Sequence, residues 1–103
     1  AQIFVRTSTY NRDVASFFNK WLIDLDDAQS AAGAFPDVAP RVIGGEGTAA
    51  WGDAGVICPW TCYIAYGDKV FLADHYPAMV KGIEYCRTNS KDLIRPATGY
   101  GDW

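Results

Sequence analysis

The chain has 103 residues, of which 50% are hydrophobic, 15% aromatic and 20% charged, and its formal net charge is -3. This length suits one small domain and is too short for a second independent core. The acidic balance without a Lys or Arg cluster argues against nucleic acid as a partner. The lack of a run near the roughly 20 apolar residues of a membrane span, and of a signal-peptide pattern, argues against a membrane.

Residues 13–29 carry the clearest helical periodicity. Apolar side chains recur at i, i+3, i+4, i+7, i+8, i+11 and i+14, namely Val14, Phe17, Phe18, Trp21, Leu22, Leu25 and Ala28. Asp13 is a suitable N-cap and Gly33 a natural stop. Lys20 and Asp24 can form an i,i+4 ion pair. The sequence therefore predicts an amphipathic helix with its charged face in water.

Residues 33–50 form a long segment without helical periodicity. It contains prolines and several glycines, and loops of this length inside compact proteins are commonly functional. The segment also holds apolar side chains, namely Phe35, Val38, Val42 and Ile43. We therefore expect a loop that packs down on the helices.

Residues 53–66 are apolar on nearly every side. Asp53 is the expected N-cap and Gly67 the expected C′ residue, while Pro59 removes one backbone hydrogen bond and predicts a kink. A helix without a polar face belongs in the interior of a larger structure. We expect this helix to need partners that the chain does not contain.

Two further helical stretches are expected near the end of the chain. Asp68 can cap a short one at 69–76, and Pro77 can begin another at 77–89, with one apolar stripe formed by Met79, Ile83 and Cys86. The fold class is therefore all-α. The chain opens on an apolar run and closes on Trp103, so we expect a segment of a longer protein.

The cysteines and the single histidine do not predict a reactive centre. Cys58, Cys62 and Cys86 are odd in number and lie in apolar surroundings, as is typical of buried free thiols. His75 has no Cys-x-x-Cys partner and is expected to be a structural or surface residue. The sequence predicts no metal site and no cofactor.

The carboxylates divide into two groups. Asp24, Asp26 and Asp27 lie beside the polar face of the first predicted helix and are expected to be solvated. Asp37, in the long loop, and Asp53, at a helix start, can both face a pocket. The alternatives are that Asp53 caps its helix and that Asp37 caps a turn.

Two tryptophans lie outside every helical stripe. Trp51 precedes the apolar helix and Trp103 follows the turn-like "TGYGD". Such rings either close the end of a core or offer a flat apolar face to a ligand. Sugar C–H faces stack on Trp while sugar hydroxyls bind Asp.

The segments "WLIDLDDAQ", "GAFPDVAP", "AWGDAGVICPW", "YGD", "YPAM" and "GDW" occur in this order along the whole chain. In this the chain resembles the catalytic domain of bacterial α-L-rhamnosidases, glycoside hydrolase family 78. The resemblance implies an (α/α)6 toroid, of which residues 1–103 would form roughly a third, as three to four helices and a long loop. Helix 53–66 would lie in the inner ring and helix 13–29 in the outer ring.

The resemblance also implies a function, which is hydrolysis of terminal α-L-rhamnosyl groups with inversion by two carboxylates about 6.5–9.5 Å apart. The general acid and base of the family lie outside this chain, and neither Glu46 nor Glu84 matches their motifs. By motif, Asp37, Trp51 and Trp103 would bind the sugar. The chain alone is then expected to be inactive.

Two readings without catalysis remain open. One is a stand-alone helical module that binds carbohydrate through the same aromatic rim. The other is a structural fragment that self-associates through exposed apolar helix faces. The sequence leaves the compartment, the linkage and the aglycone open.

Overall fold

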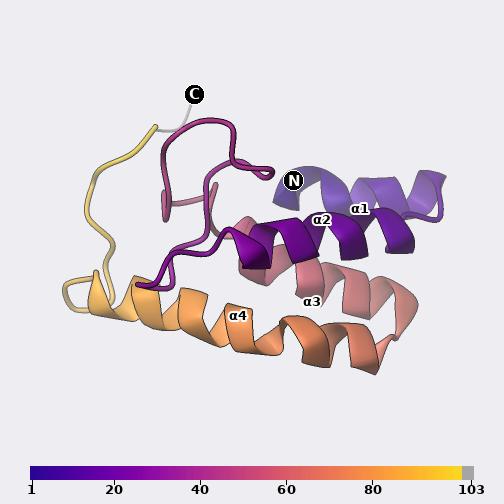
Figure 1. Ribbon diagram of the computed structural model, residues 1–103. Coiled ribbons are helices and arrows are strands. Elements are labelled where there is room, and N and C mark those ends of the chain that lie inside the picture. Colours follow the sequence, from indigo (N-terminus) through magenta and orange to yellow (C-terminus); the bar gives the residue numbers. More distant parts are fainter. Residues whose placement is uncertain (101–103) are drawn as a thin grey trace.

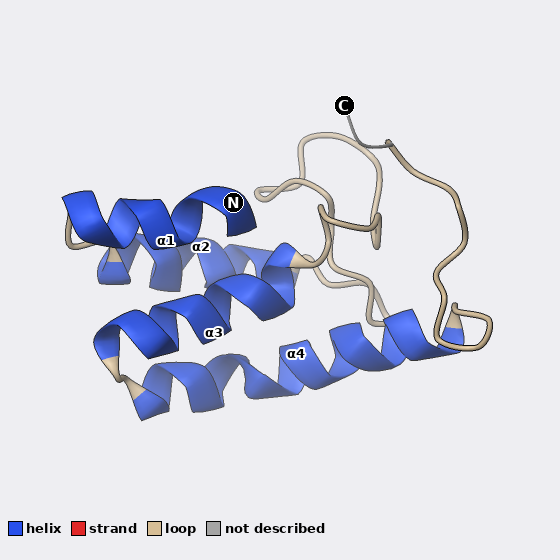
Figure 2. Cartoon of the chain, turned by 180° about the vertical axis from the view of Figure 1, so that it is seen from behind, coloured by secondary structure: helices blue, strands red, loops and turns tan. Residues whose placement is uncertain are grey.

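The structure, a computed structural model, describes residues 1–100, which form four α-helices joined by loops (Figures 1 and 2). These helices are α1 (Gln2–Asn11), α2 (Ala15–Asp27), α3 (Ala54–Tyr66) and α4 (Lys69–Thr88). In residues 1–100, β-type pairing is limited to isolated bridges at Pro36–Glu46 and Lys91–Ile94. The all-α fold class is confirmed. None of the described helices has the length and apolar character needed to cross a membrane.

Successive helices run antiparallel, and α3 packs against α4 as a hairpin, whereas α1 packs against α3 and not against α2. Helix α3 is central, because it contacts α1, α2 and α4, and α2 also contacts α4. Helices α1 and α3 begin at the end of the molecule where α2 and α4 finish (Figure 1). The long loop 28–53 and the segment 89–100 both lie at this end, which we call the loop end.

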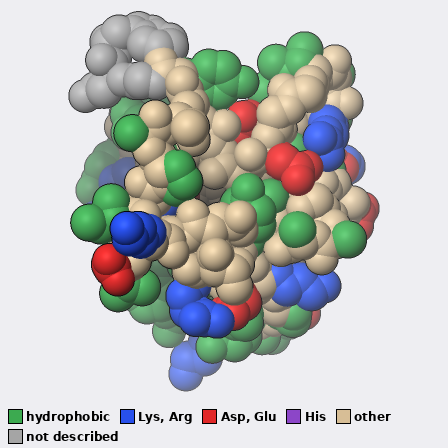
Figure 3. Space-filling view, turned by 90° about the vertical axis from the view of Figure 1, so that its left-hand side faces the viewer, with side chains coloured by type: hydrophobic (Ala, Val, Ile, Leu, Met, Phe, Trp, Pro, Cys, Tyr) green, Lys and Arg blue, Asp and Glu red, His purple; other side chains and the backbone are tan. Residues whose placement is uncertain are grey.

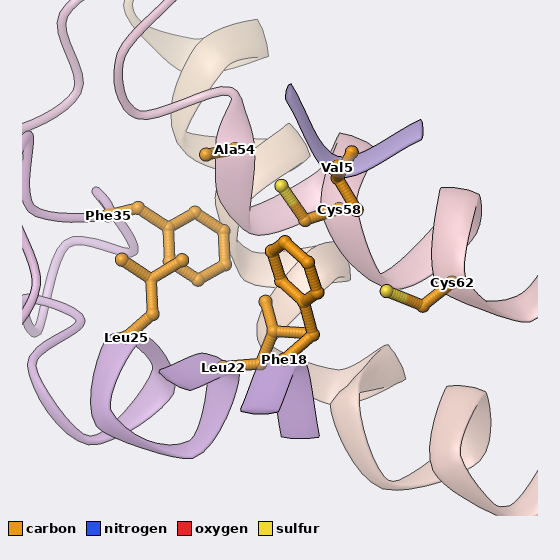
Figure 4. Close-up of a cluster of buried hydrophobic side chains, with 8 residues drawn as sticks. All are labelled: Val5, Phe18, Leu22, Leu25, Phe35, Ala54, Cys58 and Cys62. Atoms are coloured by element: carbon orange, nitrogen blue, oxygen red, sulfur yellow. The ribbon is translucent and has the colours of Figure 1, made fainter. Parts of the chain in front are cut away.

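The core lies among α1, α2 and α3 and is closed by one loop side chain, Phe35. Its members are Val5, Phe18, Leu22, Leu25, Phe35, Ala54, Cys58 and Cys62 (Figure 4). The predicted stripe of α2 supplies three of them, and the burial of each large apolar side chain stabilises the fold by about 1.5–3 kcal/mol. The predicted first amphipathic helix is thus confirmed, with its N-cap at Val14, one residue after Asp13. Lys20 forms the expected ion pair with Asp24.

The loop 28–53 packs down only in part. Phe35 is buried, and the Trp21 indole donates a hydrogen bond to the carbonyl of Ala39 (3.1 Å), which ties the loop to α2. Val42 and Ile43 are exposed, so the expectation that they pack down is wrong. They lie in the part of the loop that extends away from the helices, where residues 1–100 do not cover them.

The predicted helices differ from the structure in two places. The sequence did not predict α1, in which only Val5 and Ser8 are buried, because its stability comes from packing on α3 and not from an internal stripe. Helix α4 continues through Pro77, where a new helix was expected. Because Pro77 has no backbone N–H, the carbonyl of Ala73 loses its helical hydrogen bond. Both residues are exposed, so water can bond to that carbonyl.

Helix α3 begins and ends close to the predicted bounds, and its C-cap Gly67 has the left-handed φ of 70°. One side of α3 is buried by the other helices. On the opposite side Ile57, Trp60 and Ile64 are 41%, 52% and 52% exposed. These residues, at i, i+3 and i+7, form an apolar strip that residues 1–100 leave uncovered. We call it the α3 strip.

Candidate functional site

The predicted sugar-binding residues that the structure describes lie together at the loop end. Asp37 and Trp51 both belong to the loop between α2 and α3, whereas Trp103 lies outside the described residues. The surface on this side exposes hydrophobic, acidic and basic side chains among backbone and other side chains (Figure 3). A site here would therefore be made mainly by loops at the start of α3.

Asp37 holds the long loop in a closed turn. Its Oδ1 accepts a hydrogen bond from the backbone N–H of Thr48 (3.1 Å), and its Oδ2 accepts one from the Thr48 hydroxyl (2.7 Å). Its own N–H donates to the carbonyl of Gly45 (3.1 Å). The half-buried carboxylate thus joins the two arms of the loop. A carboxylate can accept about four hydrogen bonds, so acceptor capacity remains for a ligand.

Trp51 lies just before α3 and presents an indole ring that is 47% exposed. Its ring packs edge-to-face against Tyr100, with the ring centroids 5.2 Å apart. Its backbone N–H donates to the carbonyl of Thr48 (3.1 Å). The ring thus packs on one neighbour while about half of the residue stays exposed, so part of its apolar surface is free.

Asp53 occupies the N-cap position of α3, but its side chain makes no capping hydrogen bond. The carboxylate turns back instead: Oδ2 accepts from the N–H of Ala50 (2.9 Å) and Oδ1 from Arg95 Nη2 (2.6 Å). The expected capping bond is therefore wrong. Burial is the largest single effect on the pKa of Arg95 and lowers it, but the hydrogen bond and charge of Asp53, together with Cys86, outweigh burial, so that the pKa is raised above its usual range. Sequence reasoning missed Arg95, because no motif links it to a residue so distant in the chain.

The thiols are free, as predicted, and two of them are buried. Burial raises the pKa of Cys58 to about 12 and that of Cys62 to about 11, so both stay protonated at neutral pH. Cys86 is half-buried, with its Sγ 2.6 Å from Arg95 Nη2. Neither buried thiol is available as a nucleophile or a metal ligand.

His75 is a structural residue, as predicted. It is buried on α4, with Nδ1 2.6 Å from Asp26 Oδ2 and its ring edge-to-face against Phe71. Asp26 was expected to be solvated, and this expectation is wrong because α4 packs across α2 and brings His75 to it. In residues 1–100, groups of three or more His, Cys, Asp or Glu arranged to hold a metal ion are absent.

The two glutamates named in the sequence analysis lie in surface ion pairs. Glu46 pairs with Arg41 (3.2 Å), and Glu84 pairs with Arg87. The hydrogen bond from Arg87 lowers the pKa of Glu84. A general acid of a glycosidase needs a raised pKa, so the environment of Glu84 is unsuited to that role.

Antiparallel helices with a central apolar helix, and an aromatic and an acidic residue on the loops at one end, are the features that the sequence resemblance predicts for a segment of a six-hairpin glycosidase domain. The whole chain, residues 1–103, matches the family described as the bacterial alpha-L-rhamnosidase 6 hairpin glycosidase domain, and the chain belongs to this family. The resemblance found from the sequence motifs is thereby confirmed.

Several proteins are similar to the chain over nearly its full length. An alpha-L-rhamnosidase of Streptomyces avermitilis is 51% identical over 102 residues, which are 98% of this chain and 10% of that protein. Alpha-L-rhamnosidases of Formosa agariphila and Alteromonas sp. are 35% and 36% identical over 104 residues, covering 100% of this chain and 11% of each protein. The chain thus spans about a tenth of the length of these curated relatives.

The fold is also similar to a solved structure. The crystal structure of Streptomyces avermitilis alpha-L-rhamnosidase complexed with L-rhamnose matches with a TM-score of 0.93 and 50% sequence identity, over 99% of this chain and 10% of that one. The described helices therefore correspond to a part of a larger toroidal domain.

Proposed function

We propose that this chain works as part of an α-L-rhamnosidase that hydrolyses terminal α-L-rhamnosyl groups with inversion. In this proposal residues 1–103 are a segment of the (α/α)6 catalytic domain and contribute the rim of the sugar site. The observation that carries it is the 50% identity and 0.93 TM-score to an enzyme solved with L-rhamnose. The half-exposed Trp51 at the loop end is consistent with such a rim.

The rim binds the sugar by two kinds of contact. Trp51 offers its flat face to the C–H groups and the methyl group of rhamnose, and Trp103, which lies outside the described residues, is proposed to bind the same sugar. The remaining acceptor capacity of Asp37 receives sugar hydroxyls, while its bonds to Thr48 keep the carboxylate in place. The general acid and base, about 6.5–9.5 Å apart, come from residues outside this chain.

The α3 strip gives the rest of the catalytic domain a surface to pack against. An exposed apolar face on a central helix is costly in water and is relieved when neighbouring helices cover it. In the isolated chain the same strip would favour self-association. We infer that the natural partner of this surface is the remainder of the toroid.

The test uses the complete gene product and an aryl α-L-rhamnoside. We expect turnover by the complete protein and none by residues 1–103 alone. Trp51→Ala should raise KM by about 5- to 30-fold, since loss of a stacking face costs about 1–2 kcal/mol. Trp51→Phe should retain part of the affinity. Phe17→Ala, which removes an exposed aromatic ring on α2, is the control and should leave KM unchanged.

The stereochemistry is read separately, by proton NMR of the first rhamnose released. An inverting enzyme releases the β-anomer before mutarotation, and release of the α-anomer would contradict inversion. If the complete protein binds L-rhamnose in calorimetry and never hydrolyses the aryl rhamnoside, the enzyme proposal fails and a carbohydrate-binding module replaces it.

A further inference from the structure

The backbone immediately before Trp51 is held by Asp53. Ala50 has a left-handed φ of 68°, which non-glycine residues seldom adopt and which persists where surrounding contacts impose it. Two contacts hold this turn: the Trp51 N–H donates to the carbonyl of Thr48 (3.1 Å), and the Ala50 N–H donates to Asp53 Oδ2 (2.9 Å). The direction in which the Trp51 side chain leaves the loop therefore depends on this carboxylate as well as on the turn bond.

The second oxygen of Asp53 holds a separate part of the chain. Oδ1 accepts from Arg95 Nη2 at 2.6 Å, and the two side chains are only 30% and 31% exposed. Arg95 lies in the segment 89–100, and the same Nη2 approaches Cys86 Sγ on α4 at 2.6 Å. One guanidinium thus ties the C-terminal segment to the start of α3 and the last turns of α4.

This segment carries the residue that supports the Trp51 ring. Tyr100 lies a few residues after Arg95 in this segment. Its ring packs edge-to-face against that of Trp51, with the ring centroids 5.2 Å apart. The Asp53–Arg95 pair therefore bonds the backbone of Ala50 next to the indole and anchors the segment that carries the Tyr100 ring. Because the pair is partly withdrawn from water, it is screened less than a surface ion pair.

We infer that Asp53 and Arg95 are positioning residues for the rhamnose-binding face of Trp51, and that they act on the sugar through that ring without touching it. The inference rests on the proposed function, in which Trp51 contacts rhamnose. It assigns to Asp53 a role in substrate binding in place of the helix capping that its position suggests. It also gives the otherwise irregular C-terminal segment a part in the site.

The test compares variants of the complete gene product with an aryl α-L-rhamnoside. Asp53→Asn and Arg95→Met should each raise KM about tenfold and change kcat by less than about twofold, because the platform is displaced while the catalytic pair is intact. The double variant should be no worse than either single variant, since the two residues form one unit. Arg95→Lys keeps the charge and should recover part of the affinity. Arg87→Met, which breaks the exposed ion pair with Glu84, is the matched control and should leave KM unchanged.

A purely structural role predicts a different pattern. A lower melting temperature with unchanged KM would overturn the inference, as would a fall in kcat with unchanged KM. If the complete protein does not hydrolyse rhamnosides, the proposed function fails, and positioning is then read from fluorescence alone. Acrylamide quenching of Trp51, obtained by subtracting the emission of matching Trp51→Phe variants, should increase in Arg95→Met and stay constant in Arg87→Met. Equal quenching in all variants would overturn the inference.

Discussion

The contact between Phe35 and two helical glycines gives the sharpest test of the fold. The Phe35 ring is 3% exposed and lies among the core side chains (Figure 4), against Gly55 of α3 and Gly82 of α4. A Cβ added at Gly82 would lie 2.5 Å from Phe35 Cε2, and one added at Gly55 would lie 2.4 Å from the same ring. Both distances are far below van der Waals contact, so an added methyl group at either glycine forces the Phe35 ring or a helix to shift.

The Gly82→Ala variant therefore combines two opposing effects. Alanine favours the helix by about 1 kcal/mol over glycine, whereas overpacking a rigid core costs about 1–3 kcal/mol. We expect net destabilisation of about 1 kcal/mol. Phe35→Val removes both contacting ring atoms at a cost of about 3 kcal/mol, by comparison with other large-to-small core changes. In that background Gly82→Ala should stabilise the chain by about 1 kcal/mol, because only the helix propensity remains.

The assay is urea unfolding of the four variants of residues 1–103, followed by far-UV circular dichroism at one protein concentration. The predicted result is a change of sign, with a coupling energy between the two sites of about 1–3 kcal/mol. Gly44→Ala, where a Cβ would meet nothing within 4 Å, is the control and should stay within about 0.5 kcal/mol of the parent. The reasoning is refuted if Gly82→Ala has the same effect in both backgrounds.

Three further predictions follow from other parts of the molecule. Burial raises the folded-state pKa of Cys58 from 9.0 to about 12 and that of Cys62 from 9.0 to about 11. The stability that these protonated thiols give the folded chain is therefore fully present below pH 9 and is lost as the pH rises from 9 towards these values. Replacing both by Ala should flatten the slope of the urea midpoint above pH 9, and an unchanged slope would contradict the burial argument. Trp60→Glu should reduce self-association of the isolated chain in sedimentation velocity, whereas an unaltered distribution would show that the α3 strip is not the contact. Gly47→Ala should destabilise the chain by more than about 1 kcal/mol in urea, because φ is 67° and a Cβ would lie 2.5 Å from the ring of Tyr85. A neutral effect would count against this loop geometry.

Helices α2 and α3 could be predicted from the sequence because each carries its own signal. The α2 stripe repeats over several turns, and the all-round apolar α3 ends at a glycine with positive φ. Helix α1 carries no comparable signal, since its stability depends on packing against α3, which lies far away in the chain. Pro77 predicted a break that did not occur, because the lost bond falls on the exposed side of α4.

The candidate site was predictable only where a motif marks it. Trp51 could be singled out because it stands outside every helical stripe, and the structure leaves its ring half-exposed at the loop end. The partner of Asp53 could not be found in this way, because Arg95 is 42 residues away and only the fold brings the two together. For the same reason the contact between His75 and Asp26 was missed, since it depends on how α4 crosses α2.

The central claim is that these helices form one wall and part of the sugar site of a larger rhamnosidase domain. The most direct measurement is a crystal structure of the complete gene product with L-rhamnose bound. The account predicts that the Trp51 ring lies in van der Waals contact with the sugar and that Ile57, Trp60 and Ile64 are buried against helices from outside residues 1–103. A sugar bound away from the loop end, or an α3 strip still open to water, would contradict it.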